Sequence, residues 1–177
     1  MSNNKYKFSE KEDFEEVYKI AKFQFKKIIN NFNEFGFRHN FMELFYGEDD
    51  CHKLFLRKND VILCGTLAYL FDDCAFCDIF FWNERYEPTN TKEFRFFCEK
   101  FFLDTSKIGI NNMIVPMDKS RHKHESFKKY CQKLYFTEKE LHVTNSDVKY
   151  EYKNHYLLQV NYDNYFKKSK EVKRIKP

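Results

Sequence analysis

The segment from Trp82 to Phe94, WNERYEPTNTKEF, has the setting of a phosphate-binding loop. It follows the apolar run CDIFF, which is typical of a strand, and leads into TKEFRFFCEKFF, which is typical of a helix. Backbone N–H groups and the helix dipole bind anions at such helix starts. Phosphate loops are commonly rich in glycine, because the backbone approaches the ligand closely. This segment has no glycine and carries Pro88 at its centre, so both a phosphate loop with altered chemistry and an ordinary strand-to-helix turn stay open.

Thiols and imidazoles form a second set of candidate residues. Cys74 and Cys77 in CAFC have the C-x-x-C spacing of zinc and redox sites. No second C-x-x-C or matched histidine pair follows at zinc-finger spacing, and the pair lies in an expected strand, where positions three apart point to opposite faces. We therefore expect packing thiols and no metal site. His122 and His124 in RHKH are interpreted as a solvated helix start.

Length and charge indicate one globular domain with a basic end. The chain has 177 residues, of which 42% are apolar, enough for a single sizeable core. Residues 161–177 hold six basic and two acidic side chains, which equals the net charge of +4, so residues 1–160 sum to zero. The body thus has no general excess of positive charge for nucleic acid. We expect a domain over 1–160 and a solvated basic tail over 161–177, through which nucleic acid or an acidic partner could be contacted.

The sequence has no sign of membrane insertion. The N-terminal stretch MSNNKYKFSEKEDF is polar and lacks a signal-peptide core, and no segment approaches the roughly 20 apolar residues that span a membrane. We expect a cytoplasmic location with six free thiols in a reducing setting, or the virion or host cytoplasm for a phage-encoded chain.

Hydrophobic periodicity predicts a strand and two helices in the first 47 residues. KYKF (5–8) reads as a short strand. Ser9 and Glu12 form a capping box for a long amphipathic helix that Gly36 would end. A shorter helix is expected over NFMELFY, ending near Gly47.

The period then changes to that of a strand meander over residues 52–82. Asn59-Asp60 and Asp72-Asp73 are the expected turns. The third strand of the meander, CAFCDIFFW, is apolar on both faces toward its end, which predicts a central place in the sheet.

The second half of the chain alternates helices and strands. We expect helices over 91–107 and 120–136, a strand over 110–117, and a hairpin of strands 139–144 and 148–160 through residues 145–147. The order β-α-α-β-β-β-α-β-α-β-β is an α/β pattern with helices on both faces of a mixed sheet.

That order resembles the GCN5-related N-acetyltransferase (GNAT) family over nearly the whole length, from Lys5 to about Val160. LFLRKNDVILCGTLAYL looks like the family's second and third strands, where a reversing turn is followed by a glycine, here Gly65. ERYEPTN sits at the family's pyrophosphate loop, R/Q-x-x-G-x-G/A. HESFKKYCQKLYF is similar to the segment N-x-x-A-x-x-x-Y-x-K-x-G-F.

The resemblance implies that acetyl-CoA or another acyl-CoA lies where the fourth and fifth strands splay apart. Backbone groups at the end of the fourth strand, at Phe81 and Trp82, would pair with the pantetheine arm. Aligned on Arg85, the loop's glycines fall on Pro88, which has no N–H, and on Asn90.

The altered loop leaves part of the expected phosphate site in place. Thr89, Asn90 and Thr91 could still cap the following helix. Arg85 and the helix N-terminus would then carry most of the phosphate binding.

The resemblance also implies an acid and a base. Counting back from Phe136 puts the family's tyrosine, which protonates the leaving thiolate, on Cys131, and its glycine on Tyr135. Tyr130 is adjacent, but one helical residue turns it by about 100°. The helix-start asparagine falls on His124. Packing roles for Cys131 and Tyr130 are the alternative.

For the general base, Asp78 within the fourth strand and Glu84 at its end are the nearest carboxylates. Either could take a proton from an amine acceptor; the alternative for each, and the more common role of such a residue, is a surface or turn carboxylate.

Two functions follow as hypotheses. The first is an acyl-CoA-dependent N-acyltransferase with atypical cofactor binding, acting on an amine that the sequence does not identify. The second is an inactive GNAT-like scaffold, a structural or interaction protein such as some tailed phages encode, in which Phe80, Phe81 or Trp82 would fill the pantetheine path. Nucleic-acid binding through the basic tail is a third and weaker reading.

Overall fold

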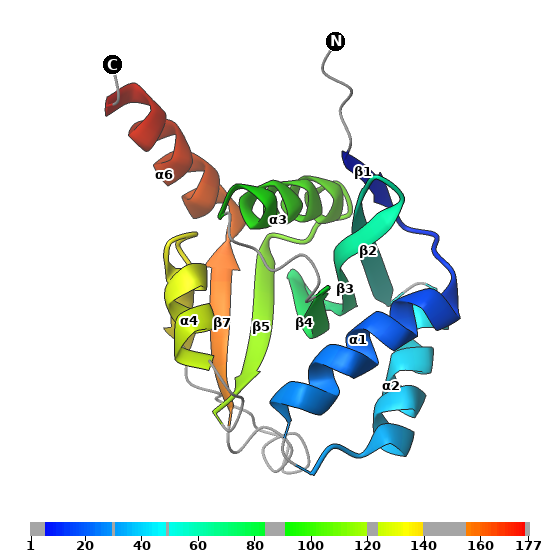
Figure 1. Cartoon of the computed structure of the whole chain (residues 1–177). Helices are drawn as coiled ribbons and strands as arrows, with labels where there is room; N and C mark the ends of the chain where they lie inside the picture. The colour runs from blue at the N-terminus through cyan, green and yellow to red at the C-terminus, as the bar shows by residue number, and fades with distance from the viewer. Residues whose placement is uncertain are drawn as a thin grey trace.

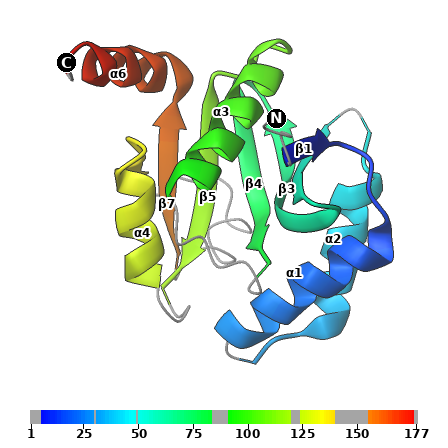
Figure 2. The same cartoon turned by 45° about the horizontal axis from the view of Figure 1, so that its top comes forward.

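The computed structural model describes residues 6–29, 31–48, 50–83, 91–119, 124–139 and 155–175. A seven-stranded sheet in the order β1-β2-β3-β4-β5-β7-β6 carries helices on both faces (Figures 1 and 2). The elements follow one another as β1 (Tyr6–Ser9), α1 (Phe14–Ile28), α2 (Glu34–Tyr46), β2 (Cys51–Lys58), β3 (Val61–Phe71), β4 (Cys74–Trp82), α3 (Thr91–Ser106), β5 (Asn112–Asp118), α4 (His124–Gln132), β6 (Thr137–Lys139), β7 (His155–Asn161) and α6 (Tyr162–Ile175).

The two N-terminal helices differ from the prediction at their boundaries. α1 begins after Asp13, whose side chain accepts a hydrogen bond from the Glu16 N–H, whereas the Ser9 hydroxyl forms a local turn with Lys11. The predicted capping box at Ser9 is therefore wrong, because aspartate is an equally good cap and lies next to the first apolar residue of the helix. Gly36 lies inside the first turn of α2, where its N–H bonds to the Asn33 side chain, so it does not end α1.

The strand meander is confirmed together with its turns. Asn59 and Asp60 both have positive φ, 49° and 65°, as a two-residue hairpin turn of type I′ requires. Asp72 has a φ of 51° in the turn between β3 and β4. β4 is the middle strand of the sheet, as its apolar sequence predicts.

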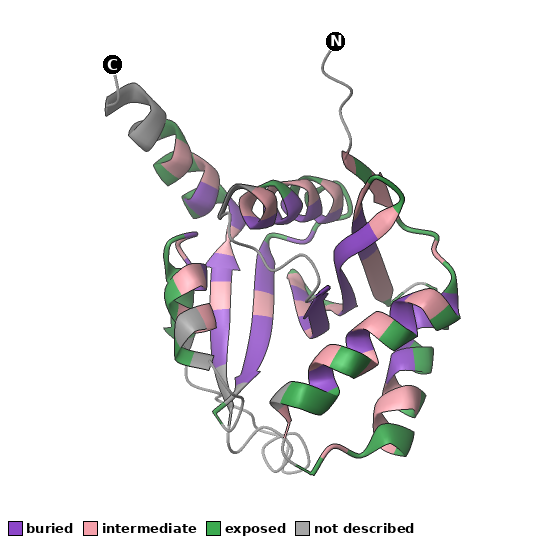
Figure 3. Ribbon diagram, viewed as in Figure 1, coloured by how far each residue is buried: buried purple, intermediate pink, exposed green. Residues whose placement is uncertain are grey.

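Apolar side chains form one core on each face of the sheet. Figure 3 shows buried residues along the strands and on the helices that cover them. The core under α1 and α2 contains Phe41, Phe55 and Phe81. The core under α3, α4 and α6 contains Phe97 and Phe101. β4 contributes to both, which explains why it has no polar face.

The C-terminal segment is a helix that begins in the core. In α6, Tyr162 and Tyr165 are buried, and the Tyr165 hydroxyl donates to Glu99 on α3 at 2.7 Å. Tyr162 and Thr105 share a second buried hydrogen bond of 2.9 Å. The expectation of a solvated extension is thus wrong for the first turn of α6, although the helix then projects from the body (Figure 1).

The last two strands pair antiparallel, as expected, with Thr137 opposite Gln159. β6 covers residues 137–139, so it begins two residues before the predicted start at residue 139. The predicted turn at 145–147 lies outside the described residues.

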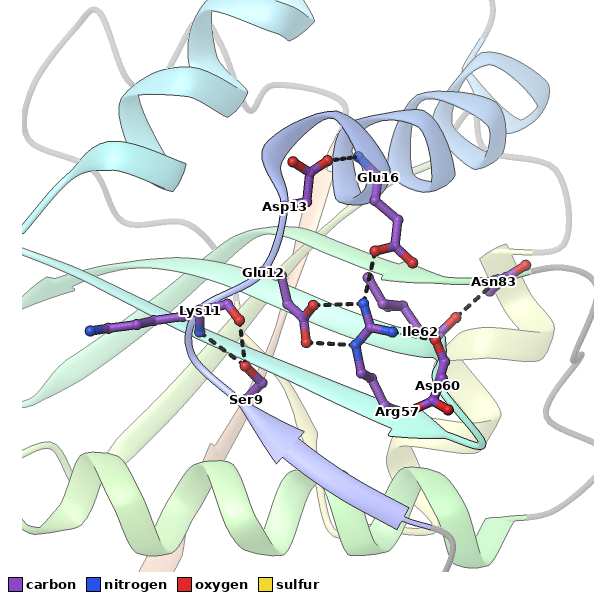
Figure 4. A network of polar contacts seen from close by, with 9 residues as sticks. All are labelled: Ser9, Lys11, Glu12, Asp13, Glu16, Arg57, Asp60, Ile62 and Asn83. Carbon is purple, nitrogen blue, oxygen red and sulfur yellow. Dashed lines mark hydrogen bonds and ion pairs between the residues drawn. The ribbon is translucent and has the colours of Figure 1, made fainter.

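A charged network joins the connection before α1 to the β2–β3 hairpin (Figure 4). Arg57 donates through Nε and Nη2 to the two carboxylate oxygens of Glu12, at 2.8 and 2.7 Å, and Nη2 also reaches Glu16. The Glu12 side chain is only 7% exposed, so the pair is shielded from water. None of the described helices is long and apolar enough to cross a membrane.

Candidate functional site

β4 and β5 pair only over their first three residues. The parallel ladder runs from Cys74–Asn112 to Phe76–Ile114 and ends there. Beyond it, β4 continues against β3 and β5 continues against β7. The two central strands therefore part, and the opening faces the end of β4 at Trp82.

The closed end of this opening is clamped by polar side chains. Asn112, at the start of β5, donates to the Asp73 carboxylate at 2.7 Å and accepts from Gln159 and Asn161 on β7. The Asp73 carbonyl accepts two backbone N–H groups from the β5 entrance. The strands are thus tied together at one end and separate at the other.

A bulge in β4 places Asp78 just past the last pair of the ladder. On β3, Ala68 alone lies between the residues paired with Phe76 and Ile79, whereas β4 has both Cys77 and Asp78 there. A bulge of two residues opposite one re-aims a side chain. As a result, Asp78 meets α2, where Asn40 Nδ2 donates to Asp78 Oδ2 at 2.6 Å.

The far end of β4 directs a backbone N–H into the opening. The Asn83 N–H bonds to the Leu63 carbonyl of β3, and successive N–H groups point to alternate edges of a strand. The Trp82 N–H therefore points away from β3, and the Gln24 Oε1 of α1 accepts from it. The N–H at this edge of β4 is thus bonded to a side-chain amide carbonyl from α1 and not to a neighbouring strand.

Aromatic side chains close the α3–α4 side of the opening. The Phe80 ring of β4 lies 6.0 Å from Phe127 of α4, and Phe94 of α3 lies 6.0 Å from Phe127 and 5.0 Å from Tyr130. Phe127 stands where the motif N-x-x-A has alanine. Phe81 and Trp82 were also predicted to fill the pantetheine path. Their side chains pack into the two different cores, Phe81 under α1 and α2 and Trp82 under α3 and α4.

The two helix residues proposed as acids lie in different surroundings. Cys131 is buried in the core, and burial raises the pKa of its thiol well above the ordinary value, which makes it a poor proton donor. The Tyr130 hydroxyl is buried without a hydrogen-bond partner among the described residues, and burial raises its pKa to about 12. Burial therefore weakens both groups as proton donors. Cys131 is fully buried whereas Tyr130 is only partly so, which makes Tyr130 the better candidate for contact with a ligand.

The backbone supports the alignment of this helix with the family motif. Tyr135, which takes the place of the motif's glycine, has a φ of 65°. Such a left-handed conformation favours glycine. The chain keeps the turn that the motif encodes while changing the residue.

Most of the predicted phosphate loop lies outside the described residues. Glu84, Arg85, Thr89 and Asn90 lie outside the described residues, and Thr91 opens α3. In the first turn of α3, Glu93 accepts hydrogen bonds from Tyr6 and, at 3.2 Å, from Lys58.

The predicted thiols give no metal centre within the described ranges. Cys77 is buried and Cys74 partly so, and burial raises their pKa values to about 12 and about 11. Among the residues that the structure describes, no group of three or more histidine, cysteine or acidic side chains could hold a metal.

Sequence reasoning missed Asn40, Gln24 and Tyr69. Asn40 and Gln24 lie on helices that were predicted from the spacing of their apolar residues, and Tyr69 lies on a strand. The sequence pattern contains no signal that points to them, because their role depends on which strand edge each helix meets.

The arrangement matches solved N-acetyltransferases. The ribosomal-protein-S18-alanine N-acetyltransferase of Escherichia coli aligns with 87% of this chain and 90% of its own at a TM-score of 0.59 and 14% identity. The PaiA N-acetyltransferase of Thermoplasma acidophilum, solved with coenzyme A, aligns with 89% and 99% at 0.60 and 12%. An acetyltransferase of Streptococcus agalactiae aligns with 90% and 99% at 0.64 and 12%. No family model matches the sequence, and no curated protein matches it significantly.

These likenesses confirm the predicted fold. The chain is a mixed α/β domain with the GNAT fold. At such low identity they carry no information on the substrate.

Proposed function

We propose that this GNAT-fold protein is an acyl-CoA-dependent N-acyltransferase that acts on a primary amine. The observation that carries the proposal is the early end of the β4–β5 ladder at Phe76, with a carboxylate, Asp78, two residues beyond it. An opening between parallel strands accommodates an extended thiol arm, and a carboxylate beside it suits proton transfer from an amine.

The reaction assigns a role to each end of β4. Asp78 would take a proton from the acceptor, whose nitrogen then attacks the thioester carbonyl; the C–N bond forms, the C–S bond breaks, and the thiolate leaves. The N–H of Trp82, now bonded to Gln24, would bind an amide carbonyl of the pantetheine arm. Arg85 and the start of α3 would hold the pyrophosphate.

Proton return to the thiolate is the step that this chain handles differently. The family's tyrosine is replaced by a buried thiol with a raised pKa. Tyr130 or water would supply the proton instead, because the Tyr130 hydroxyl lacks a partner among the described residues.

Calorimetry with acetyl-CoA, CoA and a longer acyl-CoA tests the proposal. We expect binding to the wild-type protein, weakened at least tenfold by Arg85→Ala. Turnover is then followed by mass spectrometry with a panel of amines: a peptide with an N-terminal alanine, N-acetyl-lysine amide and a polyamine. Absence of heat with all three nucleotides, together with no acylated product, would overturn the proposal.

A second candidate function is a scaffold that has lost the reaction. The observation that favours it is the ring of Phe127 at the alanine position, in contact with Phe80 and Phe94. Phe127→Ala separates the two candidates. If the protein is an enzyme, the wild type binds acetyl-CoA. If it is a scaffold, either only the Phe127→Ala variant, in which the ring is removed, binds acetyl-CoA, or neither protein does.

A further inference from the structure

We infer that Asn40 and Tyr69 are positioning residues that hold the Asp78 carboxylate at the acceptor side of the opening. The inference rests on the proposed acyltransferase function and extends it to residues of α2 and β3. Asn40 Nδ2 lies 2.6 Å from Asp78 Oδ2, and the Tyr69 hydroxyl lies 3.2 Å from Asn40 Oδ1.

The chemistry of the three groups sets the direction of the hydrogen bonds. An ionised carboxylate only accepts, so Asn40 must turn its NH₂ group toward Asp78. Its carbonyl oxygen then faces Tyr69, whose hydroxyl must donate. Tyr69 thereby orients the amide, and the amide orients and stabilises the charged form of the carboxylate.

The position of the three residues links them to the opening. Tyr69 is paired with Phe76, the last β4 residue of the β4–β5 ladder. Asp78 follows two residues later at the bulge. Since Asn40 belongs to α2, the carboxylate is held on the α1–α2 face, opposite the aromatic rings of α3 and α4.

This arrangement indicates the class of acceptor. A protonated primary amine is the group that a fixed carboxylate attracts and can deprotonate. Gln24 of α1 adds a second side-chain amide on the same face of the sheet, at the other end of β4.

Steady-state kinetics of two variants tests the inference, with acetyl-CoA and whichever amine of the panel reacts fastest. Asn40→Leu removes the donor and should lower kcat 10- to 100-fold while the KM for acetyl-CoA stays within twofold. Tyr69→Phe should lower kcat in the same way by a smaller factor, because it removes the hydroxyl that orients the Asn40 amide.

Two further variants separate positioning from folding. Asn40→Gln keeps an amide on the helix and should restore kcat toward the wild-type value. Glu43→Gln, an exposed change one turn along the same helix, should leave the kinetics unchanged. Tyr69→Phe removes one hydroxyl and keeps the ring, so it remains informative if Asn40→Leu fails to fold.

The possible outcomes separate a failure of this inference from a failure of the proposed acyltransferase function. An active wild-type protein whose Asn40 and Tyr69 variants all keep kcat within twofold of wild type would overturn the inference and leave the acyltransferase proposal standing. A wild-type protein without acetyl-CoA binding or turnover would overturn both.

Discussion

Tyr135 is held in a left-handed backbone conformation at the turn between α4 and β6. Its ring is half-buried and lies 5.9 Å from the ring of Tyr165. The position therefore combines an unfavourable backbone with a favourable aromatic contact, and two substitutions separate these effects.

Tyr135→Gly and Tyr135→Ala both remove the ring, but only glycine also removes the backbone strain. We expect the glycine variant to be more stable than the alanine variant by about 1 kcal/mol, the reverse of the order in a helix or strand. Urea unfolding of the two variants measures the difference. An alanine variant as stable as the glycine variant would show that the φ of 65° is not maintained in solution.

Arg57 is the centre of the most shielded ion pair among the described residues. Its hydrogen bond with Glu12 raises the pKa of the guanidinium above the ordinary value, and only 7% of the Glu12 side chain is exposed. Removing one partner leaves a buried charge, which costs more than the pair contributes.

Arg57→Met should therefore lower the free energy of unfolding by about 3 kcal/mol, and the double variant with Glu12→Met should recover part of this loss. Chemical denaturation of the single and double variants tests the coupling. Arg38→Met, which breaks an exposed pair with Glu15, is the control and should change stability little. A double variant less stable than Arg57→Met would contradict a buried-charge penalty.

At the scale of elements, β4 joins the fold to the candidate site. Its two apolar faces place it at the centre of the sheet, its bulge turns Asp78 toward α2, and its early separation from β5 leaves the opening. The same strand thus supplies packing, a carboxylate and a backbone edge.

The helix α6 is an integral part of the domain at its start. A chain that ends at Asn161 lacks Tyr162 and Tyr165, both at most 2% exposed, and should lose at least about 3 kcal/mol of stability. A chain that ends at Lys170 keeps both rings and should unfold like the full-length protein. Thermal and urea unfolding of the two truncations give the comparison; equal loss in both would mean that the distal part of α6 is also needed.

At the scale of the whole molecule, the thiols report on the integrity of the core. Cys64, Cys77, Cys98 and Cys131 are buried, and Cys51 and Cys74 are partly exposed. Burial raises the pKa of each of these six thiols, and that of Cys74 reaches about 11, so little thiolate is present near neutral pH.

Ellman's reagent at pH 8 should therefore modify at most two thiols of the folded protein, slowly, and all six after denaturation in urea. The time course of absorbance at the two conditions tests this. A third thiol that reacts rapidly in the folded protein would contradict the packing of the core.

Three features could be predicted from the residues alone: whether each segment is a helix or a strand, the turns at Asn59-Asp60 and Asp72-Asp73, and the central place of β4. They follow from local backbone preference and from the spacing of apolar residues. The order of elements from β1 to β7, and from that the GNAT fold, also followed from the sequence, whereas the C-terminal helix α6 was not predicted. Helix boundaries were less certain, since Asp13 and Ser9 are both good caps and only packing selects one.

The tertiary structure alone decided which side chains meet. Asn40, Tyr69 and Asp78 come from three elements up to 38 residues apart, and their contact depends on a bulge that shifts the register of β4 by one residue. The end of the β4–β5 ladder and the burial of Tyr162 and Tyr165 are likewise long-range outcomes. The spacing of apolar residues shows which side chains of a segment face the core and which face solvent. A site, in contrast, forms where side chains from several distant segments meet.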